Sequence, residues 1–269
     1  MSRSVCWNLT NICNRACEYC FRELTEESQD LETNLAILSN LKLMGVERIT
    51  FSGGEPLCYP YLYELVEAAY QMGFTCQLVT NAKLLDENNI PELFKYMSKV
   101  SFSCDSPRAY INEKIGRGED SYDHVKKAID ITRKYFSKEE LKIDINTVVT
   151  YDPTREYREL DYMLDAIRNE LLNFNIDNWK IIRFYPLRGR AKQMEKELSI
   201  PEQDFIEIKG VYSMNSSYIN IDVRDIKELD ENLIVSPQGY LKKSSNGVEV
   251  VLGDLKPPYI KKGSAGRVQ

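Results

Sequence analysis

The stretch Cys13–Cys20, CNRACEYC, places three cysteines within eight residues at the spacing C-x3-C-x2-C. The other cysteines of the chain are scattered singly, so no fourth thiol lies near enough in sequence to complete a set of four. Four thiolates close a structural zinc site or an electron-transfer cluster, whereas three can hold a cubane iron-sulfur cluster and leave one iron open. A zinc site with a remote fourth ligand, or a chance spacing, stays open as an alternative.

A second motif directly follows a predicted strand. The run Val46–Phe51 leads into Ser52-Gly53-Gly54-Glu55-Pro56. Glycine leaves bare backbone that can approach a ligand closely, and the Glu55 carboxylate is an acceptor suited to an ammonium group. Taken alone, Gly-Gly-Glu-Pro is an ordinary turn. Because it accompanies the three-cysteine loop, we interpret the two motifs as one binding site.

Together these motifs resemble the radical S-adenosylmethionine (SAM) family, whose pattern is C-x3-C-x-aromatic-C followed by a strand that ends in Gly-Gly-Glu-Pro. Tyr19 supplies the aromatic residue. The resemblance implies that Cys13, Cys17 and Cys20 hold a 4Fe-4S cluster whose open iron binds SAM. It also implies that Tyr19 lies by the adenine and that Gly53, Gly54 and Glu55 receive the methionine amino group. An electron from a reductant such as flavodoxin or ferredoxin then yields a 5′-deoxyadenosyl radical that removes hydrogen from a substrate.

Composition and charge agree with this interpretation. The 269 residues suit one α/β domain of barrel size with an appendage. Seven cysteines favour metal ligation over disulfides in a reducing, cytoplasmic setting. The formal net charge of -6 argues against stable binding of nucleic acid, which needs a basic face. The sequence contains no apolar run of signal-peptide or membrane-span length, so we expect a cytoplasmic protein without membrane association.

Short strand-like runs alternate with longer amphipathic stretches, which indicates consecutive βα units around a parallel sheet. We predict an α/β fold, a partial (β/α)6 TIM-like barrel over residues 1–186, followed by a C-terminal capping region over residues 187–269. The predicted strands are Val5–Leu9, Arg48–Phe51, Phe74–Val79, Lys99–Ser103, Lys142–Val149 and Trp179–Phe184. One predicted helical stripe comprises Leu31, Leu35, Leu38 and Leu41. The capping region is predicted to contain a helix near Pro201–Tyr212, a strand near Tyr218–Asp222 and a hairpin around Ser244–Gly247.

The predicted strands alternate polar and apolar residues with a period of two, so each has one polar face. In the fifth strand, Asp144 and Asn146 oppose Ile143 and Ile145. Helices outside a barrel must cover the apolar face, which leaves the polar residues to line the lumen as a reaction chamber. An antiparallel sheet with one solvated face would give the same alternation, but the long helical stretches between strands favour the barrel.

Within the radical SAM family, the chain resembles the viperin-like branch, whose members dehydrate a ribonucleoside triphosphate. The strings that carry the resemblance are Ile49–Pro56, Phe102–Ser106, Ile115–Gly118, Trp179-Lys180 and Ser217-Tyr218. The resemblance implies that Ser103 and Arg117 hold SAM, and we assign Asn81 to the same site. Residues at substrate-contacting positions are Arg48, Asp144, Asn146 and Lys180. Tyr218 falls on the tyrosine that returns a hydrogen to the substrate radical, since a phenol can yield a stabilised aryloxyl radical.

Two phosphate-contacting positions depart from the viperin-like pattern, and Cys6 stands where that branch has an asparagine in its first strand. Asp144 and Asn178 stand where that branch has a phosphate-contacting lysine and arginine. A carboxylate about 4 Å from a phosphate charge is unfavourable by roughly 1 to 4 kcal/mol. Either Asp144 pairs with a nearby Arg or Lys, or the substrate carries fewer phosphates and offers a hydroxyl or amine there. The alternative functions are radical SAM modification of a peptide or other biosynthetic intermediate, and a non-catalytic iron-sulfur or zinc protein.

Overall fold

One curved sheet organises the protein in its computed structural model, which describes residues 4–257 apart from 24, 26, 151–157, 172, 174, 214–218, 226–232, 246 and 247. Ten strands within the described residues follow the order β10-β9-β8-β1-β2-β3-β4-β5-β6-β7. They are β1 Ser4–Asn8, β2 Arg48–Ser52, β3 Thr75–Thr80, β4 Met97–Ser103, β5 Lys142–Val149, β6 Asn178–Arg183, β7 Asn220–Arg224, β8 Leu233–Val235, β9 Tyr240–Ser245 and β10 Val248–Asp254. Every pair from β8 through β1 to β7 is parallel, and β9 and β10 form an antiparallel hairpin.

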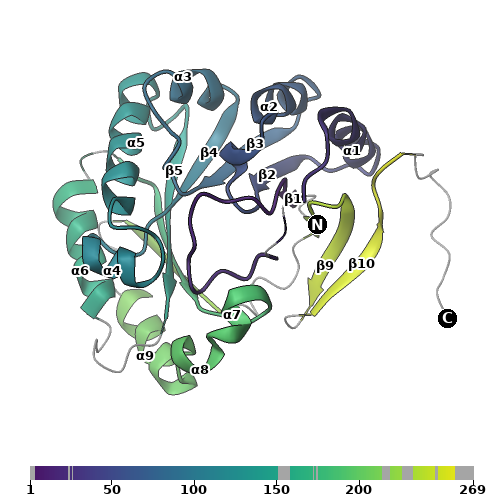
Figure 1. Cartoon of the computed structure of the whole chain (residues 1–269). Helices are drawn as coiled ribbons and strands as arrows, with labels where there is room; N and C mark the ends of the chain where they lie inside the picture. The colour runs from purple at the N-terminus through teal and green to yellow at the C-terminus, as the bar shows by residue number, and fades with distance from the viewer. Residues whose placement is uncertain are drawn as a thin grey trace.

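Helices follow the parallel strands, and the first six of them cover the outside of the sheet. They are α1 Leu31–Leu43, α2 Leu62–Gln71, α3 Asn89–Phe94, α4 Ala109–Lys114, α5 Ser121–Tyr135, α6 Arg158–Ala166, α7 Gly189–Gln193, α8 Glu195–Leu198 and α9 Glu202–Ser213, with a 3-10 turn at Pro56–Cys58 and a π-helical turn at Ile167–Leu171. Figure 1 shows α1 to α6 in an arc outside the strands, while the loop after β1 crosses the interior. The sheet does not close, because β7 and β10 are its two edges. This is the predicted partial barrel.

The apolar core lies between the sheet and the outer helices. Trp7, Phe51, Leu78, Val100 and Ile143 occupy one row of adjacent strand positions, and each is at most 1% exposed. Successive side chains on a strand point to opposite faces, so the residues between them face the lumen. The alternation read from the sequence therefore describes the sheet correctly, with the apolar face under the helices.

Helix α1 buries a different face from the predicted leucine stripe. Leu38 and Leu41 are buried as expected, but Leu35 is 37% exposed. Asn34 and Ile37 complete the buried face instead. Asn34 can be buried because its Nδ2 donates to the Tyr59 hydroxyl at 2.9 Å. A satisfied amide thus replaces an apolar residue at this position, which a purely hydrophobic pattern does not detect.

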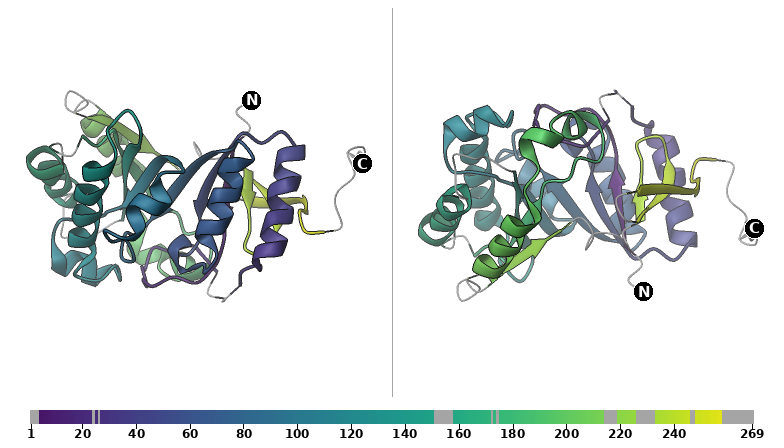
Figure 2. Two further views of the ribbon diagram at one scale, coloured as in Figure 1. Left: turned by 90° about the horizontal axis from the view of Figure 1, so that it is seen from above. Right: turned by 90° about the horizontal axis from the view of Figure 1, so that it is seen from below.

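The region after residue 186 does more than cap the barrel. The predicted strand near Tyr218–Asp222 is β7, displaced by two residues, and it extends the sheet beside β6. At the other edge, β8 pairs in parallel with β1 and carries the β9–β10 hairpin. Figure 2 shows this hairpin beside α1, where Asn40 Nδ2 donates to the Leu255 carbonyl at 2.8 Å. Without β8 and β7, strands β1 and β6 would be the edges of the sheet and would expose unpaired backbone groups. β8 and β7 satisfy these groups. The division at residue 186 stays a prediction.

Candidate active site

The loop that follows β1 brings the three motif cysteines to the mouth of the barrel. Cys17 is buried, and Cys13 and Cys20 are half-buried. All seven cysteines of the chain are free thiols. A cavity of about 290 Å³, here called the cofactor cavity, lies beneath this loop. Its lining includes Cys13, Cys17, Tyr19, Cys20, Gly53, Gly54, Glu55, Asn81, Ser103, Arg117 and Asn146. The structure thus brings together the residues predicted to bind the cluster and SAM. Asn146, predicted to contact the substrate, lines the same cavity.

Glycines let other loops contact the cysteine loop at backbone distance. Gly54 N donates to the Thr10 carbonyl at 2.6 Å, and a Cβ on Gly54 would stand 2.7 Å from the carbonyl carbon of Ile12. Gly116, with φ of +75°, accepts a hydrogen bond from Ala16 N at 3.1 Å. A Cβ on Gly116 would stand 2.9 Å from the Ala16 carbonyl carbon. Both contacts are closer than a side chain permits, so these glycines fix the shape of the cysteine loop.

The Glu55 carboxylate is occupied by the protein itself. It is 1% exposed, and its Oε2 accepts the Asn81 N–H at 2.8 Å. Its Oε1 accepts the Thr80 hydroxyl at 2.8 Å and the Leu57 N–H at 3.2 Å. Burial raises the pKa of Glu55 above its usual value in spite of these donors. Glu55 therefore ties the end of β2 to the end of β3. Reception of an amino group by Gly53, Gly54 and Glu55 stays a prediction.

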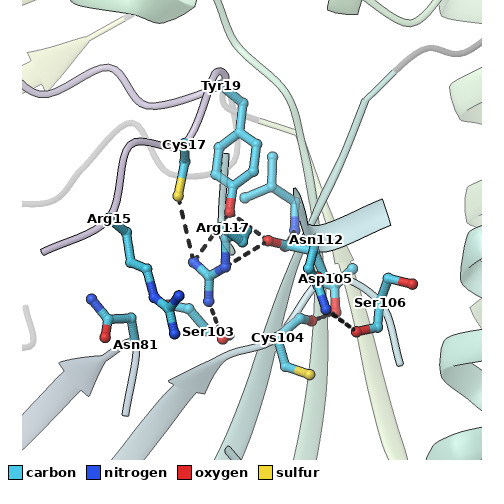
Figure 3. Close-up of polar contacts among 12 residues, drawn as sticks. Arg15, Cys17, Tyr19, Asn81, Ser103, Cys104, Asp105, Ser106, Asn112 and Arg117 are labelled. Atoms are coloured by element: carbon cyan, nitrogen blue, oxygen red, sulfur yellow. Dashed lines mark hydrogen bonds and ion pairs between the residues drawn. The ribbon is translucent and has the colours of Figure 1, made fainter. Parts of the chain in front are cut away.

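A buried polar network forms one wall of the cofactor cavity (Figure 3). Tyr19 donates its hydroxyl proton to Asp105 and accepts from Arg117 Nη1 at 3.2 Å. Burial raises the pKa of Tyr19, so the phenol stays protonated. Arg117 also donates from Nη2 to the Ser103 carbonyl, and its Nε lies 3.3 Å from Asp105 Oδ2. Protein acceptors thus engage most of the N–H donors of Arg117.

The arrangement of the thiols fits a cluster. No three His, Cys, Asp or Glu side chains in the described ranges are arranged to hold a single metal ion. A cubane distributes its cysteine ligands over separate iron atoms, so three thiols that line one cavity can hold it. Tetrahedral zinc, by contrast, needs its ligands around one centre. Asn81 Nδ2 and Arg117 Nη1, each 3.9 Å from a cysteine sulfur, are positioned to donate to ligating sulfur.

Comparison with known proteins agrees with this geometry. Residues 7–176 match the sequence profile described as the radical SAM superfamily. The chain belongs to the radical SAM superfamily. An S-adenosylmethionine-dependent nucleotide dehydratase of Flammeovirga pacifica is 27% identical over 91% of this chain and 83% of its own length. A protein of the same name from Thermoplasmatales archaeon (strain ISO4-H5) is 30% identical over 73% of this chain and 67% of its own length.

Solved structures confirm the fold of this radical SAM enzyme. The structure of anSMEcpe with bound AdoMet superposes with a TM-score of 0.70 at 17% identity, over 96% of this chain and 79% of that chain. The cofactors are therefore a 4Fe-4S cluster and SAM. Cys13, Cys17 and Cys20 would hold the cluster, and the remaining walls of the cofactor cavity would hold SAM. No helix among the described residues has the length and apolarity to cross a membrane.

A second cavity, the floor cavity, occupies the lumen near the amino ends of the strands. Its volume is about 460 Å³. The charged residues that line it are Arg48, Lys99, Asp144, Lys180, Asp222 and Arg224. All project from the polar face of the sheet, as the strand alternation predicts. The sequence reasoning missed Lys99 and Arg224. The signal for Lys99 was present, because it shares the predicted lumen face of its strand with Ser101 and Ser103.

Asp144 is the centre of the floor cavity and is paired with lysines. Its fully buried carboxylate accepts from Lys180 Nζ at 2.6 Å and Asn178 Nδ2 at 2.5 Å, and Lys99 Nζ lies 3.1 Å away. Burial acts to raise the pKa of Asp144, but the charge and hydrogen bond of Lys180, the bond from Asn178 and the charge of Lys99 outweigh it and lower the pKa. Pairing with a nearby lysine is thus the alternative that the structure shows. Arg48, in contrast, has no hydrogen-bond or ion-pair partner among the residues that the structure describes.

The other predicted residues divide between the two cavities. Asn146 lines the cofactor cavity and not the floor cavity, and its Oδ1 is buried without a hydrogen-bond partner among the described residues. Arg48 and Lys180 line the floor cavity. Tyr218 lies outside the described residues, so its role stays a prediction. The sequence reasoning also missed Asp105 and Arg15, whose partners come from distant segments.

Lys180→Met is expected to lower the free energy of unfolding by about 1–3 kcal/mol, because it leaves the buried Asp144 carboxylate with fewer donors. Urea unfolding of the apoprotein near pH 7 measures this loss. In an Asp144→Asn background, the same lysine substitution should cost clearly less, and an equal cost would contradict the pairing.

Because the folded pKa of Asp144 is depressed, its contribution to the free energy of unfolding is present above its unfolded pKa of about 3.9. The contribution is lost as pH falls through the lower folded pKa.

Proposed function

We propose that this radical SAM enzyme abstracts hydrogen from the sugar of a nucleotide and releases water, in the manner of the viperin-like branch. The names of the relatives from Flammeovirga pacifica and Thermoplasmatales archaeon support a nucleotide substrate. The observation that carries the proposal is the floor cavity, where four cationic and two carboxylate side chains line one polar space. A net positive lumen suits an anionic group such as phosphate.

The two cavities are spaced for one elongated substrate. Asn146 in the cofactor cavity and Asp144 in the floor cavity are two residues apart on the same face of β5, which is about 7 Å along a strand. A nucleotide with its sugar at the cofactor cavity would extend its phosphates toward the floor cavity. Arg48 would bind phosphate as an exposed guanidinium without another partner among the described residues, and Lys180 would add a second charge.

Each proposed residue has a defined task. When bound, the cluster and SAM supply a 5′-deoxyadenosyl radical that takes a hydrogen atom from the sugar. The buried Asn146 Oδ1 accepts a hydrogen bond from a sugar hydroxyl and orients the ring. Asp144 orients Lys180 and Lys99 beneath the substrate. The Tyr218 phenol returns a hydrogen atom to the sugar after water has left, and one electron from the flavodoxin or ferredoxin, with a proton from solvent, restores the phenol.

An anaerobic screen tests this function. The reconstituted, reduced enzyme is incubated with SAM and with nucleoside tri-, di- or monophosphates or nucleotide sugars, and 5′-deoxyadenosine is measured. We expect one nucleotide class to raise its release above the uncoupled background and to give a product lighter by one water. The same screen shows how many phosphates the substrate carries. This number has to be measured, because Asp144 neutralises part of the positive charge that lines the floor cavity. Background release with every nucleotide, together with stimulation by a peptide, would support the peptide-modifying alternative.

Tyr218→Phe is expected to preserve hydrogen abstraction while preventing formation of the dehydrated product. Removal of the phenolic O–H leaves the substrate radical without its hydrogen donor, but it leaves the cluster and SAM untouched. The measurement is the ratio of dehydrated nucleotide to 5′-deoxyadenosine. Wild-type yields of both products would remove Tyr218 from the mechanism.

The proposed setting is a reducing compartment, the cytoplasm, with a flavodoxin or ferredoxin as electron donor. Seven free thiols and an oxidisable cluster loop favour such conditions. Reduction of the reconstituted cluster by a purified flavodoxin, followed by SAM cleavage without dithionite, tests the donor. A cluster that dithionite reduces but flavodoxin and ferredoxin do not would overturn this part of the proposal.

A further inference from the structure

Arg15, between the first two motif cysteines, carries buried N–H groups without acceptors. Its side chain is 4% exposed. Nη1 is 2.5 Å from Asp120 Oδ1, but Nε and Nη2 are buried and have no hydrogen-bond partner among the described residues. A buried donor of a charged group that stays unsatisfied costs about 1–3 kcal/mol or more. Such a group in a native protein is usually satisfied by an ordered water, an ion or a bound ligand.

The surroundings of Arg15 identify that acceptor as part of the cofactor site. Arg15 lines the cofactor cavity together with the three cysteines. Figure 3 shows its side chain extending from the cysteine loop toward Asn81, Ser103 and Arg117. Arg117, the guanidinium that the sequence resemblance assigns to SAM, donates to Ser103 and Tyr19 and pairs with Asp105. Its Nε alone lacks a hydrogen-bond partner among the described residues, whereas Arg15 has two such nitrogens. The unengaged N–H groups of Arg15 are therefore the better placed donors for a bound anion.

The fold is built to hold Arg15 in this orientation. Asp120, just before α5, binds Nη1 and also contacts His124 Nε2 at 3.1 Å and Lys83 Nζ at 4.0 Å. Gly118, with φ of +83°, lies against the guanidinium, and a Cβ there would clash with Arg15 Nη1 and stand 3.1 Å from Asp120 Oδ1. One nitrogen is thus anchored while the other two are left for a ligand. Residues more than 100 positions away in sequence provide the anchor and the space.

We propose that Arg15 is a cofactor-binding residue whose Nε and Nη2 donate to an anionic acceptor of the bound cofactors, either a cluster sulfur or the carboxylate of SAM. A guanidinium presents adjacent N–H groups that suit a carboxylate, and its charge also strengthens a hydrogen bond to sulfur. A positive charge beside the cluster favours the reduced, more negative form, so it raises the reduction potential. This proposal rests on membership of the radical SAM superfamily and not on the nucleotide substrate.

The test compares Arg15→Gln and Arg15→Lys with wild type as anaerobically reconstituted holoenzymes. Lys196→Gln, which removes an exposed cation outside both cavities, is the control. Three quantities are measured: iron content, the SAM dissociation constant and the cluster midpoint potential without SAM. If the acceptor is the SAM carboxylate, Arg15→Gln weakens SAM binding about tenfold or more and leaves the potential unchanged. If it is a cluster sulfur, Arg15→Gln lowers the potential by about 59 mV, a tenfold change for one electron.

Arg15→Lys keeps the positive charge but loses the adjacent N–H groups of the guanidinium. It should therefore retain the reduction potential of the cluster better than the affinity for SAM. Wild-type values of both quantities in a loaded Arg15→Gln enzyme would overturn the proposal. If Arg15→Gln fails to take up iron, the lysine variant decides. Weakened SAM binding by a loaded Arg15→Lys enzyme would then support the SAM carboxylate as the acceptor, and wild-type SAM affinity would exclude it.

Discussion

Cys17→Ala is expected to eliminate SAM cleavage in the reduced, reconstituted enzyme. Cys17 is the most buried of the three motif thiols and would supply one iron ligand to the cluster. Replacing partners outside the ligand shell of a metal typically costs about 10- to 100-fold, so loss of a ligand itself should exceed that range. The measurements are iron and sulfide content, the 400 nm absorption region and 5′-deoxyadenosine release. Retention of cleavage would contradict ligation by the three-cysteine loop.

Cys58→Ser is the matched control for this experiment. Cys58 is a half-buried free thiol in the turn that follows Glu55, and burial raises its pKa so that it stays protonated. We expect wild-type iron content and SAM cleavage, because an iron open to SAM requires that no fourth thiolate closes the cluster. A loss of iron in Cys58→Ser would identify Cys58 as a fourth ligand. It would then favour the alternative of a non-catalytic iron-sulfur protein.

The lumen could be predicted from the sequence because strand geometry alone determines it. Asp144 and Asn146 alternate with buried isoleucines, and side chains on a strand alternate faces whatever their neighbours are. Which cations meet Asp144 could not be predicted, since Lys99 and Lys180 come from neighbouring strands whose register is set by the whole sheet. The same dependence on distant residues explains why Leu35 was wrongly predicted to be buried. Asn34 is buried in its place because it bonds to a tyrosine in another segment.

Loop residues were harder to interpret than strand residues. Arg15 lies two residues before Cys17, and nothing local in the sequence predicts its burial. Its burial depends on Gly118 and Asp120, which a chain of intervening βα units brings to the cysteine loop. The GRG string at residues 116–118 therefore has a physical meaning that its resemblance to a family did not supply. Gly116 admits the backbone of the cysteine loop, and Gly118 admits the Arg15 guanidinium.

Gly116→Ala is accordingly expected to damage the cofactor site far more than its backbone strain alone would. A residue with a Cβ at positive φ costs about 1–2 kcal/mol. At Gly116 the added Cβ also meets the Ala16 backbone, whose N–H bonds to the Gly116 carbonyl. Relief requires the cysteine loop to move away from residues 115–118. We expect cluster content and 5′-deoxyadenosine release to fall about tenfold or more, equivalent to at least about 1.4 kcal/mol.

Gly73→Ala separates the cost of a Cβ at positive φ from the cost of a steric clash with the cysteine loop. Gly73 has a φ of +79°, close to the +75° of Gly116, but a Cβ there would meet only Lys42 Nζ at 3.5 Å, an ordinary contact. This variant should lose about 1–2 kcal/mol of unfolding free energy and keep normal iron content and SAM cleavage. If the two variants lose iron equally at matched stability, the cysteine loop does not depend on its contact with Gly116. If Gly116→Ala alone loses the cluster, backbone docking of residues 115–118 is what gives the three cysteines their geometry.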